Sequence, residues 1–180
     1  MTIDAGTGDG RAVLAAAARE PATLVLGLDA NAASMAEASR RAARPARKGG
    51  RSNAGFIVAS AEAAPAELRG LANLVTVRFP WGSLLRGVVG RDAAVAAGLA
   101  SLVAAGGRIE LLVAPVERDG LDGVPTSAEA LVTGAASAFR PQGFRIECTG
   151  QPAAAEIRAL GSTWARRLDR PATLIRLVRG

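Results

Sequence analysis

Short apolar runs alternate with helical patterns along most of this chain, and this alternation limits the possible folds more than any other feature. We predict seven strands: the apolar start of the chain and residues 23–29, 54–60, 71–79, 108–116, 144–150 and 172–179. The nearly continuous apolar run at 23–29 is typical of a parallel strand that is covered on both faces. Helices are predicted at 11–20, 31–43, 91–104 and 127–139, with Asn31 as a cap and Gly106–Gly107 as a stop signal.

This order of elements predicts an α/β fold. Alternating strands and helices with short connections give an open, mostly parallel sheet with helices on both faces. The last two strands follow each other closely, which favours a terminal hairpin with one antiparallel strand. This is the plan of the Rossmann-like, seven-stranded class I methyltransferases that use S-adenosylmethionine (SAM). Neither an internal repeat nor an interdomain linker is visible, so residues 1–180 are expected to form a single domain.

Composition excludes several kinds of chemistry. The chain has no histidine and one cysteine, Cys148, which excludes an internal disulfide, histidine triads and the usual zinc sites, so no metal is expected. Cys148 stands in a strand pattern and is expected to be buried packing. No apolar run approaches the ~20 residues that a membrane span requires, and the start of the chain lacks the pattern of a signal peptide. We therefore expect a cytoplasmic protein without a membrane partner.

Positive charge is concentrated in two segments. The net charge is +6, and residues 40–51 alone contain six cations and no acid. These six are Arg40, Arg41, Arg44, Arg47, Lys48 and Arg51. A second cluster near the end of the chain includes Arg166 and Arg167. The two clusters favour a polyanionic partner, although a solvated loop in an arginine-rich chain is the alternative.

The segment DAGTGDG follows the first predicted strand and is typical of a nucleotide site. Its Gly6, Gly8 and Gly10 allow a ligand to approach the backbone closely. The G-x-G-x-G spacing is tighter than the G-x-G-x-x-G of dinucleotide sites, and with Asp4 just before it the pattern is typical of SAM sites. SAM carries an α-ammonium group, which favours a nearby carboxylate such as Asp4 or Asp9.

The residues that follow the second and third strands also suit a nucleotide cofactor. Asp29 follows the second strand and is placed to accept hydrogen bonds from both ribose hydroxyls, while Ala61 and Glu62 follow the third strand and are placed to meet the adenine edge. The predicted cofactor site is completed by three neighbours of these segments: Thr7, Ala30 and Phe79. Together these residues predict a SAM site; the alternative is an α/β domain whose cleft is vacant or binds NAD.

Two tryptophans are expected beside this site. Trp81 stands between Pro80 and Gly82 after the fourth strand, and Trp164 falls in the linker before the last strand. Ligands of such folds bind at the carboxyl ends of the strands, so two indoles on that rim could sandwich a flipped base. The alternative is that each indole covers a patch of core.

Four segments carry a family resemblance: DAGTGDGR, LDANAASMAEASRRAARPARKGG, FPWGSLLRG and STWARRL. They resemble the kanamycin–apramycin resistance family of 16S rRNA methyltransferases, and the resemblance covers nearly all of the chain. Those enzymes use SAM to methylate N1 of adenine 1408, in the decoding site of the 30S subunit, and so block aminoglycoside binding.

The resemblance implies roles for individual residues. Trp81 and Trp164 would flank the flipped adenine, and Ser162 would orient Trp164 and the cofactor side of the pocket. Phosphates of the rRNA would be bound by the loop around Arg47 and Lys48 together with Arg166 and Arg167. Adenine N1 carries a free lone pair at neutral pH, so positioning suffices and no general base is needed.

The chain departs from that family at its start, and two other functions stay open. The family normally has a short β-hairpin extension before the first strand, whereas only Met1, Thr2 and Ile3 precede Asp4 here, which predicts weaker docking. One alternative is a SAM-dependent methyltransferase for another RNA or a small molecule. The other is a non-catalytic protein that binds RNA or ribosomes. A monomer is expected because the substrate is large.

Overall fold

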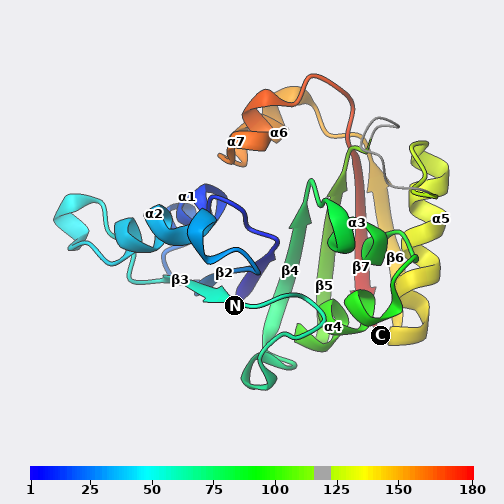
Figure 1. Ribbon diagram of the computed structural model, residues 1–180, viewed down its shortest axis with the longest axis horizontal. Coiled ribbons are helices and arrows are strands. Elements are labelled where there is room, and N and C mark those ends of the chain that lie inside the picture. Colours follow the sequence, from blue (N-terminus) through cyan, green and yellow to red (C-terminus); the bar gives the residue numbers. More distant parts are fainter. Residues whose placement is uncertain (116–122) are drawn as a thin grey trace.

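The computed structural model describes residues 1–115 and 123–180 and has one seven-stranded sheet with helices (Figure 1). The strands are β1 (Thr2–Ala5), β2 (Val25–Asp29), β3 (Ala54–Val58), β4 (Ala72–Arg78), β5 (Val103–Val113), β6 (Phe144–Gly150) and β7 (Thr173–Arg179). The α-helices are α1 (Arg11–Arg19), α2 (Ala32–Ala42), α3 (Gly82–Val88), α4 (Ala93–Leu102), α5 (Ala128–Phe139), α6 (Ala154–Ala159) and α7 (Thr163–Arg167). Short 3-10 helices are η1 (Ala46–Lys48), η2 (Ala66–Leu68) and η4 (Arg140–Gln142).

The strand order is β3-β2-β1-β4-β5-β7-β6, and β7 runs antiparallel to both of its neighbours, β5 and β6. The other paired strands are parallel to one another. The predicted fold class is therefore confirmed, including the antiparallel strand near the end of the chain. The order reverses between β1 and β4, which is where ligands of open α/β sheets bind.

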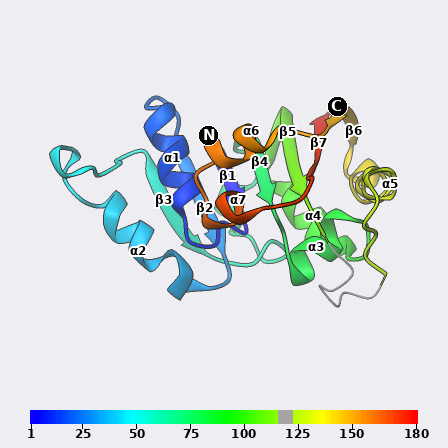
Figure 2. The ribbon, with the colours of Figure 1, turned by 90° about the horizontal axis from the view of Figure 1, so that it is seen from above.

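Alternating side chains of the strands pack against different helices. In β2, Val25 packs with Val13 and Ala17 of α1, whereas Leu28 belongs to the main core. Successive strand residues point to opposite faces, so α1 covers one face and the main core lies on the other. That core includes buried residues of α3, α4 and α5, such as Val88, Leu99 and Phe139. Figure 2 shows these three helices together beside the β4–β6 half of the sheet.

Two helix predictions can be compared with the structure residue by residue. Asn31 caps α2 as predicted, because its side chain accepts a hydrogen bond from the Ala33 N–H at 3.1 Å. The prediction that Gly106–Gly107 ends the next helix was wrong: α4 ends at Leu102, and Val103 already pairs with β4. Gly106 has a φ of 69°, and the register shifts between Ala72 and Leu74 of β4, so these glycines form an irregularity within β5.

The structure corrects three further expectations. The helices α3, α6 and α7 were not predicted, and Trp164 lies within α7 rather than in an irregular linker. The strand predicted at 108–116 ends at Val113, and Val116 lies outside the described residues. Cys148 is exposed, because it belongs to the edge strand β6, on which five of seven positions are exposed. The single-domain organisation of residues 1–180 stays a prediction.

Within residues 1–115 and 123–180, no helix is both long enough and apolar enough to cross a membrane.

Candidate functional site

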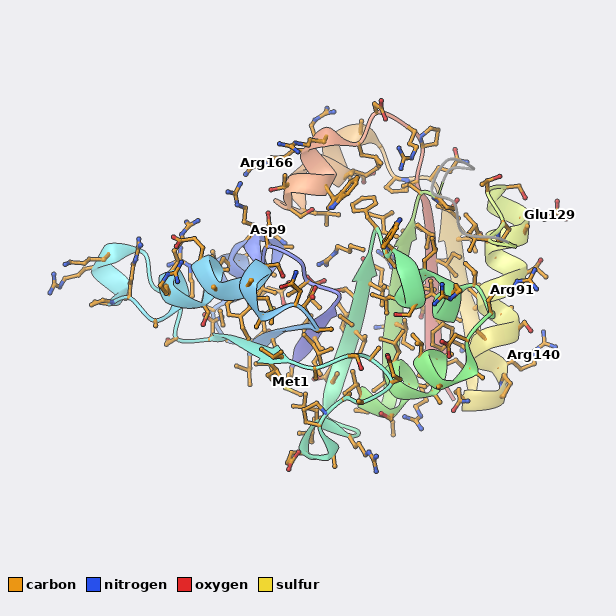
Figure 3. The ribbon with its side chains drawn as sticks, in the orientation of Figure 1. Met1, Asp9, Arg91, Glu129, Arg140 and Arg166 are labelled. Atoms are coloured by element: carbon orange, nitrogen blue, oxygen red, sulfur yellow. The ribbon has the colours of Figure 1, made fainter. Side chains whose placement is uncertain are left out.

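A cleft of about 630 Å³ lies at the carboxyl ends of β1, β2 and β4, where the strand order reverses. The helix α7 and the glycine turn after β1 form two of its sides, and Figure 3 shows Asp9 of that turn close below α7. Thirteen predicted site residues line it: Asp4, Gly6, Thr7, Gly8, Asp9, Asp29, Ala30, Ala61, Glu62, Phe79, Trp81, Ser162 and Trp164. The sheet topology thus brings together residues from both ends of the chain.

The backbone of the glycine turn lines one side of the cleft. Gly6 and Gly8 have φ values of 72° and 58°, a region that L side chains rarely adopt. A Cβ on Gly6 would collide with Leu84, so the turn packs directly against α3. Gly10 also has a positive φ, but it does not line the cleft: a Cβ there would collide with Phe56 and Ala38. Gly10 therefore serves the packing of α1 against α2 and β3.

Asp29 is fixed by the two segments that flank it. One carboxylate oxygen accepts a hydrogen bond from the Gly8 N–H, and the other accepts one from the Asn31 N–H, both at 2.8 Å. Each carboxylate oxygen has a further lone pair. Asp29 can therefore still accept two hydrogen bonds from a bound molecule, and the ribose role stays a prediction.

Asp4 is the most deeply buried acid of the cleft, with 4% of its surface exposed. Its Oδ2 accepts a hydrogen bond from the Thr7 hydroxyl at 2.9 Å. Its Oδ1 accepts two more, from the Thr76 hydroxyl at 2.6 Å and from the Arg78 guanidinium at 2.8 Å. These contacts hold the ends of β1 and β4 together, and Oδ2, which has a single protein donor, can still accept a hydrogen bond from a ligand.

Asp9 joins the glycine turn to α7. Its Oδ1 accepts a hydrogen bond from the Arg11 N–H at 3.1 Å, and its Oδ2 accepts one from the Thr163 hydroxyl at 2.5 Å. Asp9 and Thr163 are separated by 154 positions in the sequence. Asp9, one of the two carboxylates predicted for the ammonium group of SAM, thus also forms the contact that holds α7 beside the cleft.

The first aromatic wall of the cleft, Phe79 to Val88, begins with an unusual backbone turn. Phe79 is the one non-glycine residue with a positive φ (51°) in the described part of the chain. A hydrogen bond of 2.7 Å from its N–H to the Leu112 carbonyl holds this turn in place. The turn directs the chain through Pro80 to Trp81, the cap residue of α3. Left-handed backbone in a bulky residue is costly and is found preferentially at functional sites.

The second aromatic wall, residues 151–168, carries Trp164 at the start of α7. Ser162 caps this helix by accepting a hydrogen bond from the Ala165 N–H at 3.0 Å, which fixes the turn that carries Trp164. Trp81 and Trp164 are 69% and 66% exposed. The alternative that each indole covers a patch of core is therefore wrong. Both are flat apolar surfaces that border the same cleft.

The predicted cations lie outside the cleft. Arg40 and Arg41 are at the end of α2, and Arg44, Arg47, Lys48 and Arg51 follow in the projecting segment around η1 (Figure 1). Glu37 pairs with Arg40 at 3.1 Å and with Arg44 at 3.9 Å. Arg166 and Arg167 are exposed on α7, next to Trp164, and Figure 3 shows Arg166 directed away from the body of the protein.

Sequence reasoning missed three polar residues that shape the site: Thr76, Arg78 and Thr163. Arg78 and Thr163 line the cleft, and the Thr76 hydroxyl, which does not line it, donates a hydrogen bond to Asp4. Arg78 could have been found, since it stands at a predicted strand end two residues before Pro80. No sequence signal links Thr163 to Asp9. Among the described residues, no group of three His, Cys, Asp or Glu side chains could hold a metal ion.

The chain is similar to a set of rRNA-modifying enzymes. Residues 1–177 match the family model described as NpmA: 16S rRNA (adenine(1408)-N(1))-methyltransferase. The 16S rRNA (adenine(1408)-N(1))-methyltransferase of Streptoalloteichus hindustanus is 35% identical over 177 residues, which cover 94% of this chain and 80% of that protein.

Two solved structures have closely similar folds. The enzyme of the same description from Catenulisporales acidiphilia, a mutant crystallised with the cosubstrate SAM, superposes with a TM-score of 0.88 at 30% identity. This match covers 99% of this chain and 84% of that one. The aminoglycoside resistance methyltransferase NpmB1 gives a TM-score of 0.83 at 35% identity, with coverage of 99% and 86%.

Proposed function

This chain belongs to the 16S rRNA (adenine(1408)-N(1))-methyltransferase family, and on that premise we propose that it methylates N1 of the decoding-site adenine of 16S rRNA. SAM is the methyl donor, and the acceptor is the rRNA within the assembled 30S subunit. The modification confers aminoglycoside resistance. The enzyme acts as a monomer in the cytoplasm, where ribosomes are found, and needs no metal.

The observation that carries this proposal is the pair of exposed indoles beside an acid-lined cleft. Trp81 and Trp164 come from β4–α3 and α7, and both border the cavity that contains Asp4 and Asp29. Stacking of a base on an aromatic side chain is worth about 1–3 kcal/mol per base. Such surfaces offset the cost of taking an adenine out of its stack and hold it beside the donor.

The residues of the cleft fit SAM. Asp29 retains two free acceptor positions for ribose hydroxyls, and Ala61 and Glu62 line the cavity where the adenine edge is expected. Arg78 lines the cleft and has N–H donors beyond its contact with Asp4, so it can bind an acceptor atom of the cofactor. When bound, SAM supplies an electrophilic methyl group, which the adenine N1 lone pair can attack directly.

The residues of the chain then have to position the base. Trp81 and Trp164 hold the adenine ring, and Ser162 fixes the start of the helix that carries Trp164. The cations of residues 40–51, with Arg166 and Arg167, bind rRNA phosphates and orient the enzyme. Phosphate contacts carry no sequence information, so the folded shape of the 30S surface selects the target.

The test is methyl transfer from tritiated SAM to purified 30S subunits, with the modified nucleotide mapped by primer extension on 16S rRNA. We expect a stop at adenine 1408 and no label on protein-free 16S rRNA. A stop at another nucleotide would keep the enzyme class and refute the target. Salt-sensitive binding to 30S subunits without any label would favour a non-catalytic relative.

A further inference from the structure

The charges that line the cleft are unequal. Four acids border it, namely Asp4, Asp9, Asp29 and Glu62, and among the described lining residues Arg78 is the one cation. SAM carries two positive groups, the sulfonium and the α-ammonium, and one negative group, the carboxylate of its methionine part. The acids suit the two cations, and the carboxylate needs a donor of opposite charge.

Arg78 has donors left to offer. It stands at the end of β4, and its side chain is 16% exposed. One terminal nitrogen donates to Asp4 Oδ1 at 2.8 Å, while the buried Nε has no hydrogen-bond partner among the described residues. An unpaired buried donor costs free energy, and the side chain that carries it lines the cavity.

Asp4 holds Arg78 in a fixed orientation. Thr7 and Thr76 donate to the same carboxylate, and all three contacts are fully or partly buried. The guanidinium is planar and carries five N–H donors, so a group held by one terminal nitrogen still has N–H donors to offer to a second carboxylate. Charge-assisted hydrogen bonds of this kind are about twice as strong as neutral ones.

We propose that Arg78 binds the methionyl carboxylate of SAM and thereby selects the intact amino-acid end of the cofactor. Asp4, which contacts Arg78 directly, is the positioning residue for this arginine. This assignment rests on the proposed function, because it takes SAM as the molecule that occupies the cleft. The competing explanation is that Arg78 only neutralises the buried Asp4 carboxylate.

Calorimetric binding of SAM and of decarboxylated SAM separates these two explanations. Decarboxylated SAM keeps the adenosine, sulfonium and amine but lacks the carboxylate. We expect the unmodified protein to bind SAM at least about tenfold more tightly, since one charge-assisted contact contributes that much. In Arg78→Gln this preference should vanish or reverse, because the cleft becomes more negative and the decarboxylated ligand carries one more net positive charge.

Thr76→Val is the matched control. It removes a hydrogen bond from the same oxygen of Asp4, but Thr76 does not line the cleft and is isosteric with valine. If Arg78 contacts the ligand, Thr76→Val retains most of the preference for SAM. An equal loss of preference in both variants, or equal affinity of the unmodified protein for the two ligands, would refute the assignment.

The ligand series also separates this assignment from the proposed function. Equal affinities for both ligands leave a SAM-binding protein and remove only the role of Arg78. Absence of binding to either ligand would refute SAM as the cofactor, and the assignment with it. Should Arg78→Gln not fold, Arg78→Lys keeps a positive charge near Asp4 but lacks the additional N–H donors of the guanidinium. It is then expected to lose most of the preference for SAM while retaining affinity for the decarboxylated ligand.

Discussion

The two aromatic walls of the cleft carry almost equally exposed tryptophans on very different supports. The first wall, Phe79 to Val88, is anchored in the main core by Leu85 and Val88, which are fully buried, and only its first residue, Phe79, packs against the smaller cluster of the second wall. The second wall, residues 151–168, buries only Ile157 and Ala165, in a small separate cluster with Leu112 and Ala172. Two hydrogen bonds tie it to the glycine turn and α1: Thr163 to Asp9, and Arg19 to the Ala159 carbonyl. One wall is therefore set by the fold, and the other is held by a few polar contacts.

The largest expected effect comes from removing both indoles. In the double variant Trp81→Ala/Trp164→Ala, we expect methyl transfer to 30S subunits to fall at least about 30-fold, because two stacking contacts of about 1–3 kcal/mol each are lost. The melting temperature and SAM affinity should stay unchanged, since both side chains are exposed. Initial rates of tritium transfer measure the effect. If Trp164→Ala alone behaved like the unmodified enzyme, only the core-supported wall would hold the base.

The next largest effect is expected from a substitution that disturbs the packing of the first wall against the core. Gly87 is buried in α3, and a Cβ there would collide with Val95 of α4. Gly87→Ala should lower the free energy of unfolding by about 1–3 kcal/mol, the usual cost of overpacking a core. Urea denaturation measures it. The exposed Arg86→Ala in the same helix is the control and should lie within about 0.5 kcal/mol of the unmodified protein. A stable Gly87→Ala would show that the first wall is not set by the core.

The smallest effect is expected from the loss of a polar contact of the second wall. Thr163→Val removes the hydrogen bond to Asp9, and a net loss of about 1 kcal/mol should loosen α7 without changing global stability. Faster amide hydrogen exchange confined to residues 151–168 is expected, together with a few-fold lower rate of methyl transfer. Thr163→Ser keeps the hydroxyl and serves as the control. Faster exchange throughout the molecule would contradict a local role.

Sequence reasoning succeeded where a local pattern determines the structure. The apolar run of β2, the cap at Asn31 and the glycine turn each leave a signal within a few residues of sequence. Once the α/β fold class was predicted, the carboxyl ends of the parallel strands could be placed at the same edge of the sheet. Its failures share another cause. The short helices α6 and α7 bury few side chains, so they leave no clear apolar period.

Long-range polar contacts were equally hidden from the sequence. The partners of Asp4 and Asp9 lie 74 and 154 positions away in Arg78 and Thr163, and only the folded sheet brings them together. Cys148 shows the same limit, because its strand pattern does not reveal that β6 is an edge strand. Residue types at the strand ends could thus be read from the sequence, but which carboxylates remain free for a ligand could not.

The place of β7 in the sheet determines when the cleft can form during synthesis. This strand is inserted between β5 and β6, although it follows both in the chain. The segment that carries Trp164 connects β6 to β7, so its far end is untethered until β7 has paired. Such non-local pairing is slow and leaves strand edges open while it proceeds. A nascent chain therefore completes its aromatic cleft only after residues 173–179 have left the ribosome that makes it.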